Sequence, residues 1–137
     1  MTLAVVAADQ ISKAAVRGSI VPGETRNLLP GLQLVDTRNR GVAFGFLPGR
    51  HLIVSVLVGL ALVVLLIYFA RNSSKPLIWL PTGLLLGGAL GNILDRLRVG
   101  SVTDFVKLPL GWPPFNLADA AITIGVLLLF FLAERPE

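Results

Sequence analysis

LIVSVLVGLALVVLLIYFA, residues 52–70, contains no charged side chain and consists almost entirely of leucine, valine, isoleucine and alanine. A helix that crosses the apolar core of a bilayer needs about 20 consecutive apolar residues. The stretch therefore predicts a membrane-spanning helix, and it determines the fold class expected for the rest of the chain.

Apolar segments lie on both sides of this stretch. Residues 77–97 follow a proline and end in a polar cluster, and residues 116–133 form another apolar run. Both predict spans. Residues 1–16 are apolar but include Asp9, Gln10 and Lys13. They fit a truncated span, an interfacial helix or a cleaved targeting segment.

The two longer connections have a different composition. Residues 17–50 hold glycine, proline, asparagine and arginine around short alternating apolar stretches, which predicts a small strand-and-turn element. Residues 98–115 contain glycines and prolines that prevent a continuous helix. The arginines of residues 17–50 would place that connection in the cytoplasm by the positive-inside rule, which conflicts with the topology expected below.

Composition excludes several classes of protein. With 54% hydrophobic and 15% charged residues, the 137-residue chain is one domain, residues 1–137, too apolar for a water-soluble globule. It has no cysteine, so disulfides, thiolate metal sites and cysteine nucleophiles are excluded. Its net charge of +4 comes from basic residues scattered between apolar blocks, which favours contact with lipid headgroups over nucleic acid.

Ionisable groups in apolar segments are costly, about 2.5–3.5 kcal/mol each at a helix centre, so each needs an explanation. Asp9 and Lys13 are four residues apart, which fits either a self-neutralising ion pair or a scaffold for a neighbouring site. Asp95 beside Arg96 indicates local charge compensation. The four-residue spacing of glycines 83, 87 and 91 indicates close helix packing.

Carboxylates are the groups left for chemistry. Asn116 and Asp119 have the spacing of a helix cap with an acid in the first turn. Asp104 lies in a short extended stretch whose apolar neighbours favour burial. The single histidine, His51, abuts the longest apolar run, and no serine has a lysine in a recognisable arrangement, so neither a histidine-based triad nor a metal site is expected.

Five ordered motifs resemble the lipoprotein signal peptidase (signal peptidase II) family over nearly the whole chain. They are DQISK (9–13), NRGVAFG (39–45), GGALGNILDR (87–96), VTDF (102–105) and FNLAD (115–119). The resemblance implies an all-α membrane protein, a bundle of four transmembrane helices at about 1–16, 52–70, 77–97 and 116–133. A small extracytoplasmic β-cradle from residues 17–50 would accompany the bundle, with both termini cytoplasmic.

The resemblance also implies an aspartic endopeptidase of the bacterial cell membrane that needs no cofactor or metal. It would cut diacylglyceryl-modified prolipoproteins just before the lipid-modified cysteine, with its site on the extracytoplasmic side. The implied catalytic pair is Asp104 and Asp119, of which we expect Asp119 to be the ionised base and Asp104 to hold the proton. The implied substrate-binding or supporting residues are Asp9, Lys13, Asn39, Gly41, Asn92, Asp95, Arg96 and Asn116.

Two departures and two alternatives accompany this interpretation. Only eight residues precede Asp9, which predicts that a full first helix would need further residues upstream, and the connection between Asp104 and Asp119 is short. Membrane carboxylates also fit a proton-conducting bundle or transporter. Glycine-mediated packing fits a structural assembly factor, but neither alternative explains the order of the motifs.

Overall fold

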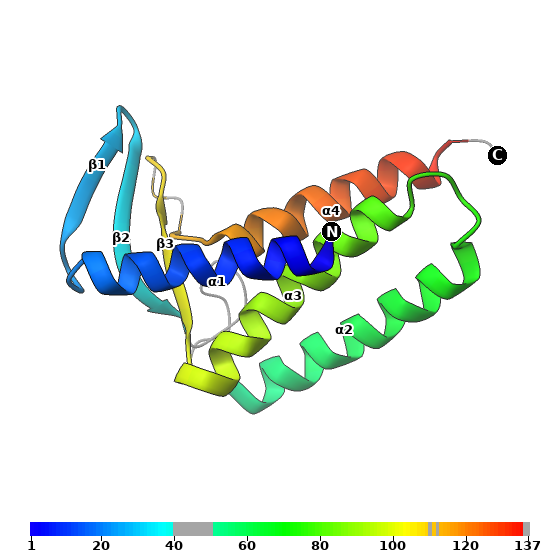
Figure 1. Ribbon diagram of the computed structural model, residues 1–137, viewed down its shortest axis with the longest axis horizontal. Helices are drawn as coiled ribbons and strands as arrows, with labels where there is room; N and C mark the ends of the chain where they lie inside the picture. Colours follow the sequence, from blue (N-terminus) through cyan, green and yellow to red (C-terminus); the bar gives the residue numbers. More distant parts are fainter. Residues whose placement is uncertain (40–50, 110, 112, 136–137) are drawn as a thin grey trace.

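The computed structural model describes residues 1–39, 51–109, 111 and 113–135. A small sheet lies at one end of the molecule, and long helices run away from it (Figure 1). In chain order the described elements are α1 (Thr2–Ser19), β1 (Thr25–Leu29), β2 (Leu32–Asn39), α2 (His51–Asn72), α3 (Trp79–Val99), β3 (Val102–Lys107) and α4 (Leu117–Ala133).

The sheet is antiparallel, with strand order β1-β2-β3. The β1–β2 hairpin turns at Gly31, whose φ of 81° lies in the left-handed region that glycine adopts most readily. Between β2 and β3, Thr37 pairs with Asp104, and the register shifts between Leu34 and Thr37. Two residues of β2 therefore lie opposite one residue of β3, which is the arrangement of a β-bulge.

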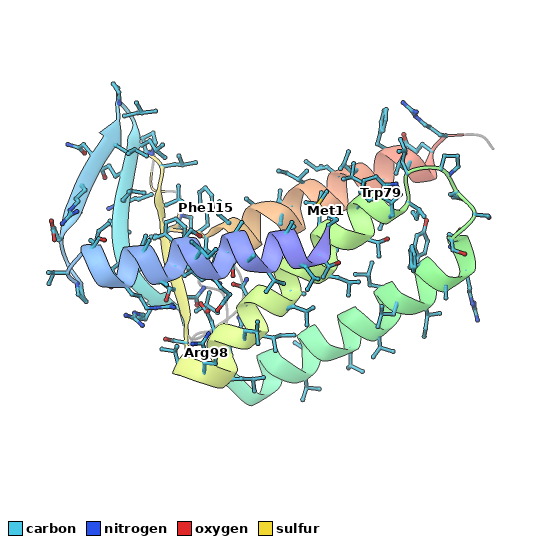
Figure 2. The ribbon with its side chains drawn as sticks, viewed as in Figure 1. Met1, Trp79, Arg98 and Phe115 are labelled. Carbon is cyan, nitrogen blue, oxygen red and sulfur yellow. The ribbon has the colours of Figure 1, made fainter. Side chains whose placement is uncertain are left out.

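Glycines on α3 allow α1 and α4 to approach closely, as their spacing predicted. A methyl group added at Gly87 would overlap the Val5 side chain, and one added at Gly91 would overlap the Asp9 carboxylate. At Gly83 the neighbour is Met1, which lies beside α3 in Figure 2. This close approach of the α1 and α3 backbones brings the polar side chains of these two helices within hydrogen-bonding distance of each other.

The interior has an apolar part and a polar part. Val16 and Ile20, near the end of α1, pack against Phe105 of β3 and form the apolar cluster. The polar part lies where α1, α3, β3 and the start of α4 meet, and its fully or almost fully buried side chains are Asp9, Lys13, Asn92, Asp95, Thr103, Asp104, Asn116 and Asp119. Polar groups remain buried only where hydrogen bonds satisfy them.

The predicted all-α bundle of four membrane spans is wrong. The described residues form four helices and a three-stranded antiparallel sheet. None of the helices within the described residues has both the length and the apolarity needed to cross a membrane. In α1 the charged residues Asp9, Lys13 and Arg17 interrupt the apolar sequence, and α4 has 17 residues, fewer than the roughly 20 that a span requires.

Candidate active site

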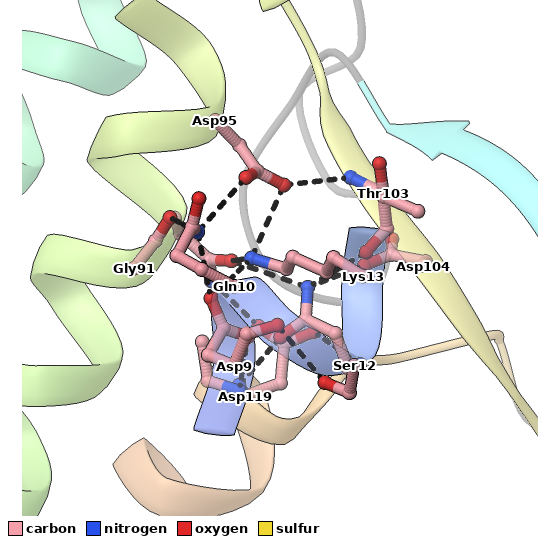
Figure 3. Close-up of polar contacts among 12 residues, drawn as sticks. Asp9, Gln10, Ser12, Lys13, Gly91, Asp95, Thr103, Asp104 and Asp119 are labelled. Carbon is pink, nitrogen blue, oxygen red and sulfur yellow. Dashed lines mark hydrogen bonds and ion pairs between the residues drawn. The ribbon is translucent and has the colours of Figure 1, made fainter. Parts of the chain in front are cut away.

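A lysine between two carboxylates forms the base of the polar junction. The Lys13 Nζ lies 2.7 Å from Asp9 Oδ2 and 3.1 Å from Asp95 Oδ2, and all three side chains are buried (Figure 3). Asp9 Oδ1 accepts a hydrogen bond of 3.0 Å from the backbone N–H of Ala118, in the first turn of α4. The Asp9–Lys13 pair is thus both an ion pair and a scaffold that joins α1 to α3 and α4.

Lys13 also fixes the orientation of a neighbouring amide. Its Nζ donates to Asn92 Oδ1 at 3.0 Å, and Asn92 Nδ2 donates to Asp119 Oδ1 at 3.0 Å. An ammonium group only donates hydrogen bonds, so the Asn92 oxygen must face Lys13 and the amide nitrogen must face Asp119. The charge of Lys13 therefore determines that Asn92 presents a donor to the Asp119 carboxylate.

Asn116 begins α4 and binds Asp119 through a reciprocal cap. The Asp119 N–H donates to Asn116 Oδ1 at 2.9 Å, and the Asn116 N–H donates to Asp119 Oδ2 at 3.3 Å. This is a capping box, in which each side chain accepts the other residue's backbone N–H. The helix cap predicted from the spacing of these residues is confirmed, and it places the Asp119 carboxylate at the N-terminus of α4.

The same asparagine reaches the second carboxylate. Asn116 Nδ2 donates to Asp104 Oδ1 at 2.8 Å and to Asn92 Oδ1 at 3.1 Å. Asn39, at the end of β2, is also hydrogen-bonded to the Asp104 side chain. The order Asp104–Asn116–Asn92–Asp119 is therefore a continuous hydrogen-bonded bridge, which we call the amide bridge.

Burial changes the acidity of Asp104. Removal from water, reinforced by the negative charge of Asp119, raises the pKa of Asp104 to about 7, although the asparagine hydrogen bonds and Lys13 oppose this shift. The Asp104 carboxyl therefore retains its proton up to near-neutral pH. A protonated carboxyl next to a second carboxylate is an arrangement that supports general acid–base chemistry.

Two of the predicted site residues, Arg96 and Gly41, are not part of the amide bridge. Arg96 lies on α3, and its charge interacts favourably with Asp119, Asp104 and Asp95. Gly41 lies outside the described residues, as does most of the 39–45 motif to which it belongs. Among the described residues, no group of three or more His, Cys, Asp or Glu side chains is arranged to hold a metal ion.

Three residues at the junction were given no role in the sequence analysis. Gln10 Nε2 donates to Asp95 Oδ1 at 3.1 Å and to the Gly91 carbonyl at 3.0 Å. Thr103 is fully buried, and its Oγ1 accepts a 2.7 Å hydrogen bond from Arg17 Nη1. Gln10 and Arg17 are polar residues in an apolar helical segment, and that signal was available in the sequence for both.

Comparisons with known proteins show which families and structures the chain is similar to. A family model described as signal peptidase (SPase) II matches residues 1–133. The lipoprotein signal peptidase of Syntrophomonas wolfei is 47% identical over 131 residues, which cover 95% of this chain and 87% of the relative. That of Halothermothrix orenii is 38% identical over 138 residues, covering 100% of this chain and 94% of the relative. A solved structure of a bacterial membrane enzyme is similar with a TM-score of 0.89 and 28% identity, covering 99% of this chain and 90% of the other.

Proposed function

The chain belongs to the signal peptidase II family, and from this premise we propose that Asp104 and Asp119 are its catalytic pair. Proteins of this family are aspartic peptidases that cleave signal peptides from prolipoproteins, and this chain is such an enzyme. The observation that supports our assignment is the amide bridge, which connects these two buried carboxylates through Asn92 and Asn116.

Burial raises the pKa of both carboxylates, but the groups that bind them differ. Asp119 lies in the first turn of α4, where the helix dipole favours an anion, and it accepts hydrogen bonds from Asn92 Nδ2 and from the Asn116 backbone. The pKa of Asp104, about 7, favours its protonated form below neutral pH. Asp119 is therefore the base in our proposal, and Asp104 is the acid.

The proposed reaction requires one water molecule and one proton on the pair. Asp119 takes a proton from the water as the water oxygen bonds to the carbonyl carbon of the scissile peptide. The C–N bond then breaks, and the leaving nitrogen takes the proton that Asp104 held. The pair finishes with one proton, now on Asp119, and the transfer of that proton back to Asp104 restores the starting state.

The other junction residues hold this pair in place. Lys13 orients Asn92, while Asp9 and Asp95 compensate the charge of Lys13. Asn39 and Asn116 support Asp104. In our proposal Arg96 and Gly41 belong to the same supporting set, Arg96 through its charge interactions with the pair.

The finer features of the substrate are part of the proposal. We expect cleavage just before a diacylglyceryl-modified cysteine at the surface of the bacterial cell membrane. Exposed apolar side chains on α2, among them Leu57, Leu60 and Val64, suit contact with lipid. Residues 17–50 and 98–115 would lie on the extracytoplasmic side, together with the active site.

The orientation has a direct test, because the chain has no native cysteine. A cysteine introduced at the exposed Ser19 should react with a membrane-impermeant thiol reagent in intact cells. Labelling that occurs only after cell lysis would contradict the extracytoplasmic placement.

The catalytic assignment is tested by Asp104→Asn and Asp119→Asn. Both substitutions nearly preserve side-chain volume but remove the acid or the base, so each should lower cleavage of a diacylglyceryl-modified prolipoprotein peptide by about a thousandfold. Mass spectrometry of the products measures the loss. Glu24, which lies just before β1, has a carboxylate outside the junction, so Glu24→Gln is the matched control and should cleave normally. Near-normal turnover by either aspartate variant would exclude the pair.

A further inference from the structure

Thr103, the residue before Asp104, is bound through its backbone by two helices. Its N–H donates to Asp95 Oδ2 at 3.0 Å, and its carbonyl accepts a 3.2 Å hydrogen bond from Asn116 Nδ2. These contacts join β3 to α3 and to the start of α4. They explain how the strand is attached to the junction, but they do not involve the Thr103 side chain.

A third helix binds the Thr103 side chain. Arg17 Nη1, in the last turn of α1, donates to Thr103 Oγ1 at 2.7 Å. A hydrogen bond with a charged donor is shorter and stronger than one between neutral groups. A cation in the last turn is also favoured by the dipole of the helix. Arg17 is therefore a well-placed donor whose bonding partner is a fully buried hydroxyl.

Adjacent residues of a strand point to opposite faces of the sheet. Asp104 turns toward Asn116 and the amide bridge, so Thr103 presents its hydroxyl on the other face. The Arg17 contact is thus made on the face of β3 opposite to the Asp104 carboxyl.

The strand needs such a restraint at this point. The register between β2 and β3 shifts between Leu34 and Thr37, immediately beside the Thr37–Asp104 pair, and a bulge disrupts the hydrogen-bond ladder locally. Thr37 Oγ1 donates to the Asp104 carbonyl at 2.6 Å, which is a side-chain contact rather than a ladder bond. Side-chain contacts therefore contribute strongly to the position of β3 at Asp104.

We propose that Arg17 is a positioning residue for Asp104, acting through the Thr103 hydroxyl. The proposal rests on the assignment of Asp104 as the catalytic acid. Arg17 holds the strand that bears Asp104 so that its carboxyl stays within reach of Asn116 and of the bound peptide. In this proposal Arg17 acts on the strand and not on the substrate, so its removal should slow the chemical step without weakening substrate binding.

Steady-state kinetics of the purified full-length chain with a lipidated peptide test this proposal. Arg17→Met keeps much of the apolar stem but removes the donor, and Thr103→Val removes the acceptor. Each should lower kcat by roughly 5- to 50-fold and leave KM within about twofold, because small misplacements of reacting groups reduce rate strongly. Thr103→Ser retains the hydroxyl and should restore most of kcat. Arg26→Met, which alters an exposed arginine of β1, is the matched control and should leave both constants unchanged.

A double-mutant cycle distinguishes positioning from two unrelated losses. If Arg17 acts through Thr103, the double variant should be no slower than the slower single variant, whereas independent effects would multiply. Multiplying effects, unchanged kcat in Arg17→Met, or a rise in KM alone would overturn the proposal. If Arg17→Met does not fold, the comparison of Thr103→Val with Thr103→Ser decides, and equal kcat in those two variants overturns it. Normal cleavage by Asp104→Asn would instead exclude the catalytic pair itself.

Discussion

Four buried aspartates lie within one junction, yet they form two pairs with different environments. Asp9 and Asp95 both contact the Lys13 ammonium, at 2.7 and 3.1 Å. Asp104 and Asp119 accept their hydrogen bonds from asparagine side chains and backbone N–H groups. The first pair is compensated by a full positive charge in direct contact, and the second is held mainly by neutral dipoles.

This difference explains how identical side chains can serve either structure or chemistry. The Lys13 ammonium binds Asp9 and Asp95 directly and so ties both carboxylates into the scaffold of the junction. Neutral amides hold a carboxyl in place while allowing it to gain or lose a proton, and they exert less preference for the charged form. Burial and the negative charge of Asp119 raise the pKa of Asp104 to about 7, and the hydrogen bonds from the asparagines oppose this shift only in part.

Removal of the lysine should break the compensated pair completely. Lys13→Met would leave Asp9 and Asp95 buried without their shared cation, and breaking a buried ion pair in this way costs about 3–5 kcal/mol. We expect a large loss of folded protein, measured by chemical denaturation of detergent-purified samples. Stability equal to that of the parent would mean that the two pairs do not differ as described.

A smaller effect is expected at Asp95. Asp95→Asn keeps the volume but places an amide where Lys13, Gln10 and the Thr103 N–H all donate to the carboxylate. One donor then loses its acceptor, so we expect a destabilisation of roughly 2–3 kcal/mol, visible as a lower midpoint of thermal unfolding. Asp104→Asn measured beside it at pH 5 should not show this loss, because Asn116 can still donate to the remaining amide oxygen.

A third effect depends on pH and has the opposite sign. The pKa of Asp104 in the folded protein, about 7, is above the value of about 3.9 in an unfolded chain. At any pH between these two values, the folded protein holds a proton that the unfolded chain has lost. The free energy of unfolding therefore falls from about pH 4 to about pH 7. Asp104→Asn removes this loss, so the variant should be more stable than the parent at pH 8, with little difference at pH 4. Parallel unfolding curves at both pH values would contradict the assignment.

Local patterns in the sequence indicated several parts of the site. The spacing of Asn116 and Asp119 predicted a helix cap, and the cap is present as a reciprocal pair. The spacing of Asp9 and Lys13 predicted an ion pair on one helical face, and it is observed. Both features depend on residues within one helical turn, whose geometry follows directly from the helix period.

Features that join distant segments were beyond these patterns. The contact of Arg17 with Thr103 joins residues 86 positions apart, and it depends on the register of β3 against β2. The bulge next to Thr37 shifts that register, and no periodic pattern in the sequence of β2 predicts the bulge. The span prediction failed for a different reason, because apolar composition was read without sufficient weight for the charged residues of α1 and for the 17-residue length of α4.

The Asn116 amide shares its two hydrogens among Asp104, Asn92 and the Thr103 carbonyl. In an isotope-labelled sample, those hydrogens give resonances that respond directly to the state of each acceptor. Loss of the Asp104 proton strengthens one of these bonds and moves its signal, while opening of the first turn of α4 moves the signal of the Asp119 N–H that Asn116 caps. The enzyme thus contains a built-in spectroscopic sensor that reports on the proton and on the helix separately, with no label attached to the substrate.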